Sequence, residues 1–258
     1  MWVFRTIAES DLGLIREGNE DSGLVTARLL AVADGMGGHV GGEVASKIAI
    51  HSLAKLEPVL NEAKIDVDSR EDLLLNITFE IDREIAFQSQ LDPSLTGMGT
   101  TLTAIHLEKK SIELLHVGDS RCYRYRDGKL TQLSYDHTLM QELIDQGRLT
   151  HEEVFDHPQR SVLTQVLMGN SQLDPVLQIF PTEVGDHFLL CSDGLTSVLS
   201  DLEIVEIIRK CNDSELLPEL ISATKSKGAP DNITILWAEV VVANKDSTST
   251  VLIGAAHD

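Results

Sequence analysis

The sequence predicts an α+β fold in which antiparallel sheets are covered by helices. One observation behind this is a series of short apolar or alternating segments at 101–108, 112–117, 121–126 and 129–133, separated by short turns. The last two are joined by Asp127-Gly128, a dipeptide that favours a tight hairpin. The other is that helical patterns do not alternate regularly with the strands, which disfavours a purely parallel sheet.

The segments before these hairpins are predicted as two strands followed by two helices. Residues 2–9 and 24–33 are predicted as strands, the second strongly apolar. Residues 43–56 place apolar side chains on one helical face, and residues 69–90 do so every fourth position from Leu73 to Ile85.

The segments after the hairpins are predicted as a mixture of strands and helices. The expected helices lie at 139–146, 202–211 and 215–226, and the expected strands at 176–180, 187–191 and 233–242. Residues 243–258 are polar and rich in small side chains. We therefore expect one catalytic domain over residues 1–242, followed by a polar tail or the start of a linker at 243–258.

Composition excludes several classes of function. The 258 residues carry 21 Lys and Arg against 41 Asp and Glu, a net charge of −20, which disfavours binding to nucleic acid or anionic membranes. Aromatic residues make up 4 %, so the core must be mostly aliphatic. No apolar run approaches the roughly 20 residues of a membrane span. Three widely spaced cysteines without a CxxC pair indicate a reducing compartment.

Acidic residues recur where apolar strands end. Asp34-Gly35 follows the strand at 24–33, and Asp193-Gly194 follows the strand at 187–191. Gly118-Asp119 follows the strand at 112–117, Asp231-Asn232 directly precedes the strand at 233–242, and Glu20-Asp21 is expected in a turn between the first two strands. A single acidic residue here is usually a turn residue, but strand ends that converge at one edge would crowd these carboxylates together and require cations between them. Carboxylates and carbonyl oxygens are the ligands that Mg²⁺ and Mn²⁺ prefer.

The glycine-rich turn at residues 34–42 leaves alternatives open. It is compatible with a plain strand-to-helix turn, with a metal site, or with a dinucleotide-binding oxidoreductase, although GxGxxG fails because the sixth position from Gly35 is Val40. A P-loop, a Cys-x5-Arg phosphatase motif, a GxSxG elbow and HExxH are all missing from the sequence. Metal-activated water is then the best remaining chemistry.

An ordered set of short motifs resembles the protein phosphatase 2C family of metal-dependent Ser/Thr protein phosphatases, in a bacterial form. The motifs run from about residue 6 to 240, nearly the whole chain. They are Arg16-x-x-Asn19-Glu20-Asp21, Ala33-Asp34-Gly35-Met36-Gly37-Gly38-His39, Gly97-Met98-Gly99-Thr100-Thr101, Val117-Gly118-Asp119-Ser120-Arg121, Asp136-His137, Cys191-Ser192-Asp193-Gly194 and Asp231-Asn232-Ile233-Thr234.

The resemblance implies a four-layer αββα sandwich of two antiparallel sheets, with two Mn²⁺ or Mg²⁺ ions in a cleft at one edge. It also implies roles for individual residues. Asp34 would bridge the two ions. Asp193 and Asp231 would bind the first ion, and the Gly35 carbonyl would bind the second, with Asp21 and Glu20 acting there through water. Asp119 would hold a third ion together with Asp193. Arg16 would bind the phosphate, because its planar fork matches paired oxygens.

Two features depart from the family pattern. Animal members carry a histidine directly after the Asp-Gly, where this chain has Met36, so His39 is a candidate general acid for the leaving group. The plainer alternative for His39 is a helix-entry residue bonded to backbone. Residues 163–169 also differ from relatives. The segment that begins at Asp136 and ends at Asn170 is expected to be a flap that selects substrate.

The resemblance implies hydrolysis of phosphoserine and phosphothreonine in proteins, opposing bacterial Ser/Thr kinases. The alternative is a catalytically silent relative that binds phosphoproteins without releasing phosphate. The expected partners are phosphorylated proteins, namely the kinases and their substrates, and we expect a monomer in the cytoplasm. Some bacterial relatives join this domain to a membrane span, and the polar residues at 243–258 are compatible with such a continuation.

Overall fold

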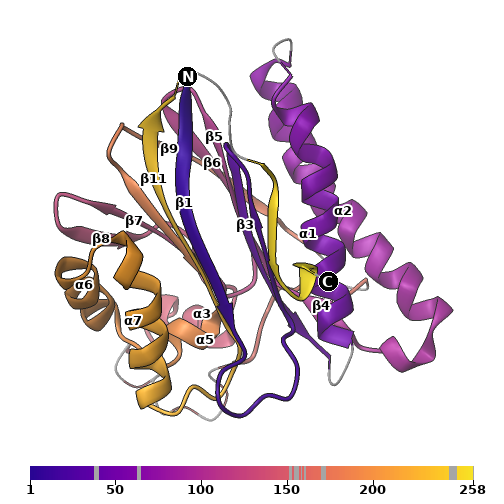
Figure 1. Ribbon diagram of the computed structural model, residues 1–258. Helices are drawn as coiled ribbons and strands as arrows, with labels where there is room; N and C mark the ends of the chain where they lie inside the picture. The colour runs from indigo at the N-terminus through magenta and orange to yellow at the C-terminus, as the bar shows by residue number, and fades with distance from the viewer. Residues whose placement is uncertain are drawn as a thin grey trace.

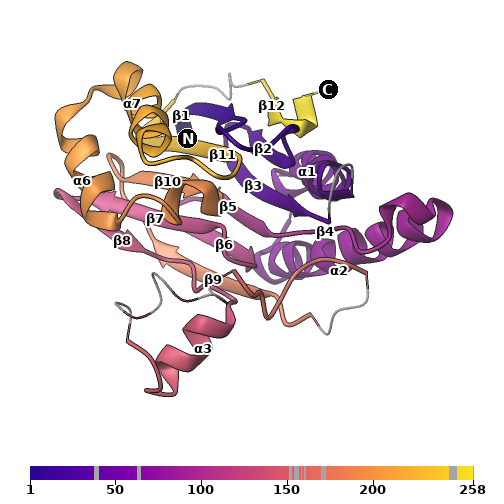
Figure 2. The same cartoon turned by 90° about the horizontal axis from the view of Figure 1, so that it is seen from below.

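The structure is a computed structural model, in which two antiparallel sheets pack face to face with helices on both outer faces (Figure 1). It describes residues 1–37, 41–62, 65–150, 153, 157, 159, 161–169, 173–243 and 249–257. The view from below shows the four layers in succession (Figure 2). The predicted αββα sandwich is confirmed.

The first sheet has five strands in the order β1-β11-β10-β7-β8. Its strands are β1 (Trp2–Asp11), β7 (Arg121–Arg126), β8 (Lys129–Gln132), β10 (His187–Cys191) and β11 (Ile233–Val242). The first and last of these in the chain pair over their full length, from Trp2 opposite Val242 to Asp11 opposite Ile233. Segments more than 200 residues apart are thereby joined.

The second sheet follows the order β12-β2-β3-β5-β6-β9, with β4 paired to the end of β3. Its strands are β2 (Asp21–Val25), β3 (Leu29–Met36), β4 (Gly99–Thr100), β5 (Leu102–Glu108), β6 (Ser111–Val117), β9 (Val176–Pro181) and β12 (Val251–Gly254). Every pairing in this sheet is antiparallel.

Helices α1 (Gly41–Leu60) and α2 (Val67–Leu91) lie on the second sheet, and α6 (Asp201–Lys210) and α7 (Asp213–Ser226) lie on the first. Shorter elements are η1 (Pro93–Leu95), α3 (Leu139–Asp145), α5 (Asp193–Thr196) and η2 (Ala255–His257). Within the described residues, no helix is long and apolar enough to cross a membrane.

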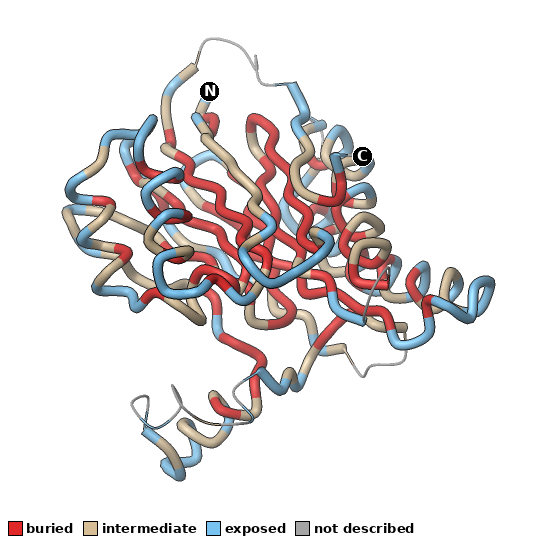
Figure 3. The backbone as a smooth tube through the Cα atoms, turned by 60° about the horizontal axis from the view of Figure 1, so that its bottom comes forward, coloured by how far each residue is buried: buried red, intermediate tan, exposed pale blue. Residues whose placement is uncertain are grey.

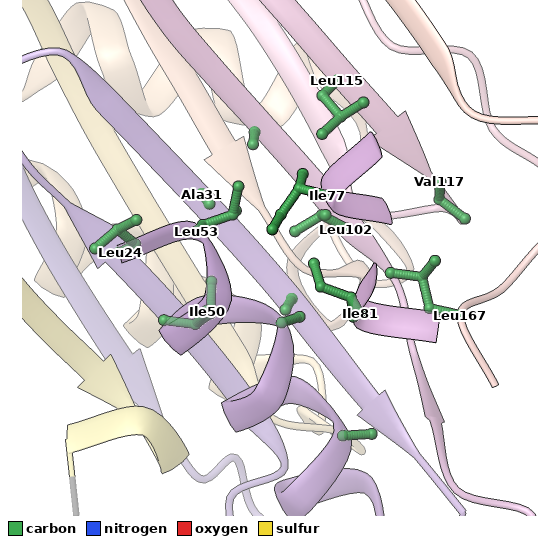
Figure 4. Close-up of a cluster of buried hydrophobic side chains, with 14 of the residues drawn as sticks. Leu24, Ala31, Ile50, Leu53, Ile77, Ile81, Leu102, Leu115, Val117 and Leu167 are labelled. Carbon is green, nitrogen blue, oxygen red and sulfur yellow. The ribbon is translucent and has the colours of Figure 1, made fainter. Parts of the chain in front are cut away.

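Each interface between layers has its own apolar core. Leu30, Val32 and Leu236 belong to the core between the sheets. Ile77 and Ile81 of α2 belong to the core between α1, α2 and the second sheet, where the side chains point toward one another (Figure 4). Most of the largest fully buried side chains are Leu and Ile, as the low aromatic content predicts.

Two predictions about individual segments were wrong. Residues 24–33 form two strands instead of one, because Thr26 Oγ1 accepts the backbone N–H groups of Arg28 and Leu29 and turns the chain. The second concerns the C-terminal stretch expected as a tail. It contains β12, which pairs with β2, and the buried Ala256 that packs against the core under α1. The apolar run Val251–Gly254 fits this sheet edge, although the whole stretch is polar on average.

Buried strands fill the centre of the molecule (Figure 3), whereas α3 projects away from the sandwich (Figure 2). The β1–β2 loop and the C-terminal end of β3 lie at the lower end of Figure 1, and the N-terminus lies at the upper end. We call the lower end the acidic end, because the strand-end aspartates described below lie there.

Candidate active site

A pocket of about 280 Å³ at the acidic end brings most of the predicted site residues together. Its walls come from strand ends and loops that are distant in sequence. The lining residues are Arg16, Glu20, Asp34, Gly35, Met36, Gly37, Thr101, Asp119, Ser161, Leu163, Asp193 and Asp231. The convergence of strand ends predicted from the sequence therefore exists in the fold.

Asp34 and Gly35 occupy the end of β3, where the strand meets helix α1. The carbonyl of Asp34 accepts the Thr101 N–H at 2.9 Å and Thr100 Oγ1 at 3.0 Å, and the Asp34 N–H donates to Thr101 Oγ1 at 3.0 Å. A Cβ at position 35 would lie 2.1 Å from the Gly42 carbonyl oxygen. Glycine is therefore required by the close approach of β3 and α1.

Asp193 and Gly194 are the corresponding pair, which opens α5 just after the end of β10. Asp193 is the first residue of α5, and a Cβ at Gly194 would lie 1.9 Å from the Asn232 carbonyl oxygen. In both Asp-Gly pairs, the glycine lets a neighbouring backbone approach closely. The preceding aspartate is thereby placed at the pocket.

Asp119 lies in the β6–β7 turn, which the start of the predicted flap holds in place. The Gly118 N–H donates to His137 Nδ1 at 3.0 Å, and the His137 N–H donates to the Gly118 carbonyl at 2.8 Å. Arg121 forms a forked ion pair with Asp136, with its shortest contact at 2.6 Å. These contacts fix the turn that places Asp119 in the same pocket as Asp193.

Asp21 lies behind the pocket rather than on its wall. Its side chain is buried and accepts a hydrogen bond from Ser192 Oγ at 2.6 Å. The neighbouring residue, Glu20, does line the pocket, and its carbonyl accepts from Ser46 Oγ at 2.6 Å. Asp21 belongs to β2, opposite Asp34, and not to a turn as expected.

Arg16 contributes the positive charge that lines the pocket in the described part of the chain. Its Nη2 donates to Asp231 Oδ2 at 2.7 Å, and its Nη1 lies 3.8 Å from Glu20 Oε2. The hydrogen bond to Asp231 raises the pKa of the guanidinium. With its side chain 45 % exposed, Arg16 faces both the carboxylates and solvent.

Burial and crowding raise the pKa values of the aspartates in and behind the pocket. Burial, and then the charges of neighbouring aspartates, raise the pKa of Asp34 well above its usual value. Burial and Asp231 raise the pKa of Asp193, and burial and Asp193 raise the pKa of Asp119 to about 8. Burial raises the pKa of Asp21 to about 7, although the Ser192 hydroxyl opposes this shift. Burial and mutual repulsion of these carboxylates therefore outweigh the attraction of nearby positive charge.

The donor set fits hard divalent cations in kind and in place. Carboxylates and the Gly35 carbonyl are oxygen ligands of the type that Mn²⁺ and Mg²⁺ bind, and a cation would relieve the repulsion that raises the pKa values. Among the described residues, no three His, Cys, Asp or Glu side chains already stand close enough around one point to hold an ion. The residues therefore fit divalent cations because their donor atoms are oxygens and because they line the same pocket.

Two predictions concern residues that the structure describes incompletely. His39 lies outside the described residues, and so does Asn170, the expected end of the flap. The flap is therefore described from Asp136 only as far as 169 and with gaps between 150 and 161, so its predicted boundary at Asn170 is not tested. The described part includes α3, and Ser161 and Leu163 reach the pocket wall.

Three residues that support the site were not singled out as site residues from the sequence. Thr101 holds Asp34, Ser192 holds Asp21, and Asn232 binds the β1–β2 loop. All three lie within motifs noted above, and this membership was the one feature of the sequence that could have identified them as site residues. Their partners became evident only from the strand register.

The dinucleotide interpretation of the glycine-rich turn does not fit the fold. That fingerprint requires parallel strands joined by a crossover helix. Here β3 pairs antiparallel with both β2 and β5.

Comparison with known proteins gives one consistent result. A sequence profile described as "Protein phosphatase 2C" matches residues 19–220. The serine/threonine protein phosphatase PstP of Mycobacterium tuberculosis is 43 % identical over 256 residues, covering 98 % of this chain and 48 % of PstP. The chain therefore spans about half the length of this relative.

Two further similarities extend this result. The serine/threonine phosphatase stp of Listeria monocytogenes is 36 % identical over 242 residues, covering 92 % of this chain and 94 % of the relative. The crystal structure of the PstP catalytic domain in complex with two manganese ions superposes with a TM-score of 0.83 at 42 % identity, covering 94 % of this chain and 100 % of that chain.

Proposed function

Since the chain belongs to the protein phosphatase 2C family, we propose that it hydrolyses phosphoserine and phosphothreonine in proteins with the help of two divalent metal ions. The observation that carries this proposal is the pocket in which one arginine faces aspartates from four separate segments. The relatives named as Ser/Thr phosphatases and the manganese-bound PstP structure support it.

The residues proposed to hold the two ions are Asp34, the Gly35 carbonyl, Asp193 and Asp231, with Asp21 and Glu20 acting through water. Two such ions lower the pKa of a water molecule toward neutrality and so make it a nucleophile at physiological pH. Asp119 lies in the same pocket as Asp193 and is the candidate ligand for a third ion.

Arg16 is proposed to bind the phosphoryl group of the substrate. Its guanidinium lines the same pocket as the aspartates and presents paired N–H donors that match two phosphate oxygens. Arg16 also contacts Asp231 and Glu20, which restrict where its charge can lie. His39 remains the candidate for protonating the departing serine or threonine oxygen.

The flap from Asp136 to Asn170 is proposed to select substrates, because Ser161 and Leu163 border the pocket while α3 projects outward. The expected partners are proteins phosphorylated by Ser/Thr kinases, together with the kinases themselves. A location in the cytoplasm is consistent with three free cysteines, and a monomer is the expected state.

The test is phosphate release from a phosphothreonine peptide, first with Mn²⁺ and then with excess EDTA. Release that requires Mn²⁺ and stops with EDTA is expected. Peptide binding without phosphate release, in folded protein with metal present, would instead identify a silent phosphoprotein-binding relative.

A further inference from the structure

The loop that carries Arg16 is joined to the start of β11 by one side chain. Asn232, directly after Asp231, is 3 % exposed. Its Nδ2 donates to the carbonyl oxygens of Leu12 at 3.0 Å and Gly18 at 3.1 Å, and its Oδ1 accepts the N–H of Glu20 at 2.8 Å. One buried amide therefore uses both its donor and its acceptor capacity on a single loop.

These three contacts flank Arg16. They lie four residues before it, two residues after it and four residues after it. The segment 12–20 has no regular secondary structure of its own. Other contacts of the loop include the Leu14 N–H donating to the Ala229 carbonyl at 2.9 Å and Asn19 Nδ2 donating to Ser10 Oγ at 2.8 Å.

We propose that Asn232 is a positioning residue, which clamps the β1–β2 loop so that the Arg16 guanidinium stays at the pocket. This inference rests on the proposed function, in which Arg16 binds the phosphoryl group. Asn232 itself does not line the pocket among the described residues, so it acts through the loop rather than on the substrate.

The chemistry of the amide makes this role specific to asparagine. An aspartate at position 232 has the same size but would place a carboxylate oxygen, which has no hydrogen to donate, against two carbonyl oxygens. Serine is too short to reach both sides of the loop. Asn232→Asp and Asn232→Ser thus remove the clamp in two different ways.

The first experiment uses trypsin, because Arg16 is itself a cleavage site inside the clamped loop. Cleavage after Arg16 is compared with cleavage after Lys109, whose side chain is 85 % exposed on the β5–β6 turn at the other end of the molecule. Losing these hydrogen bonds is expected to raise the ratio of the two cleavage rates by about tenfold. An unchanged ratio in both variants would overturn the proposal.

The second experiment is a double-mutant cycle on phosphopeptide hydrolysis. Either Asn232 variant is expected to raise KM by about tenfold with a smaller effect on kcat, since binding of the phosphoryl group is impaired. In an Arg16→Ala background, the same change should alter KM by less than about twofold. Independent, multiplying effects would show that Asn232 does not act through Arg16.

The matched control is Asn212→Ala. Asn212 caps α7 by accepting the Ser214 N–H at 3.0 Å and is exposed, so its loss lowers stability without touching the loop. It should leave both the cleavage ratio and KM unchanged. A control that reproduces the Asn232 effects would mean that general destabilisation explains them.

Hydrogen exchange of the wild-type protein gives a further test that needs no variant. The Glu20 amide should exchange as slowly as the amides of β2, because its acceptor is the buried Asn232 Oδ1; rapid exchange would contradict the clamp. If the wild-type protein releases no phosphate in the presence of metal, the proposed function is refuted. The trypsin and hydrogen-exchange experiments would still test whether Asn232 holds the loop, because they do not depend on activity.

Discussion

The two ends of the sandwich bury carboxylates with opposite consequences. At the acidic end, burial and neighbouring aspartates raise the pKa of Asp34 and Asp193. Toward the other end, Glu113 of β6 is 2 % exposed, and burial would also raise its pKa. His106 and Arg70 outweigh that effect and lower the pKa of Glu113.

The two groups of carboxylates differ in their partners. Arg70 Nε donates to both oxygens of Glu113, at 3.1 and 3.2 Å, and His106 Nδ1 lies 2.9 Å from Glu113 Oε2. Arg70 Nη1 also lies 3.4 Å from Glu108. The paired charges join α2 to the second sheet, whereas the crowded acids repel one another, a repulsion that a bound cation would relieve.

The largest expected effect comes from removing a crowded carboxylate. Asp34→Asn should lower metal-dependent phosphate release by roughly 10³-fold or more, because it removes the proposed bridging ligand. Its Tm in EDTA should not fall, because a repelling charge is lost. Asp127→Asn in the exposed hairpin is the matched control and should keep full activity. Full activity in Asp34→Asn would refute the assignment.

The opposite result is expected where the buried charge is paired. Arg70→Met should lower the free energy of unfolding by about 3–5 kcal/mol, because it leaves Glu113 buried without the arginine that pairs with it. Urea unfolding measures this, and the folded fraction should retain its turnover. Adding Glu113→Leu should recover much of the loss. A stable single variant would show that the pair is not needed.

Lowering the pH should also test how strongly its partners stabilise the ionised form of Glu113. Because the folded protein holds the pKa of Glu113 below 4.5, its contribution to stability is complete above that pH and is lost as the pH falls through the lower value. Urea unfolding from about pH 5.5 to about pH 3 should therefore show a steeper loss in the wild type than in Glu113→Gln. Parallel curves would argue that Glu113 is not specially stabilised when ionised.

The smallest effect is expected for an exposed charge beside that network. Lys109 Nζ lies 3.9 Å from Glu108, but its side chain is 85 % exposed. Lys109→Ala should change the free energy of unfolding by no more than about 0.5 kcal/mol and leave turnover unchanged. A larger change would mean that the network extends to the surface.

The elements that sequence predicts well are those in which local pattern and tertiary environment agree. The four-residue repeat from Leu73 to Ile85 predicts α2, and Asp127-Gly128 predicts the β7–β8 hairpin. The turn at 26–28 was missed because 24–33 is apolar on both sides of it, and β12 was missed because its pairing with β2 is not visible in local composition.

The candidate site divides in the same way. The acidic strand ends, including Asp34 and Asp193, are visible as residues after apolar runs. The contacts that hold them depend on register between distant segments, as between Ser192 and Asp21. Arg70 is another example, since a single arginine on a helix is normally a surface residue until β5 and β6 bring His106 and Glu113 beneath it.

The pairing of β1 with β11 has a consequence for how the protein is made. In the described part of the chain, β11 is the one neighbour of β1 in its sheet, so β1 cannot pair until a strand more than 200 residues later has been translated. The second sheet from β2 to β9 can assemble earlier during synthesis. Asp231 and Asn232 directly precede β11, so the pocket and the loop that carries Arg16 are completed only after β11 has been translated.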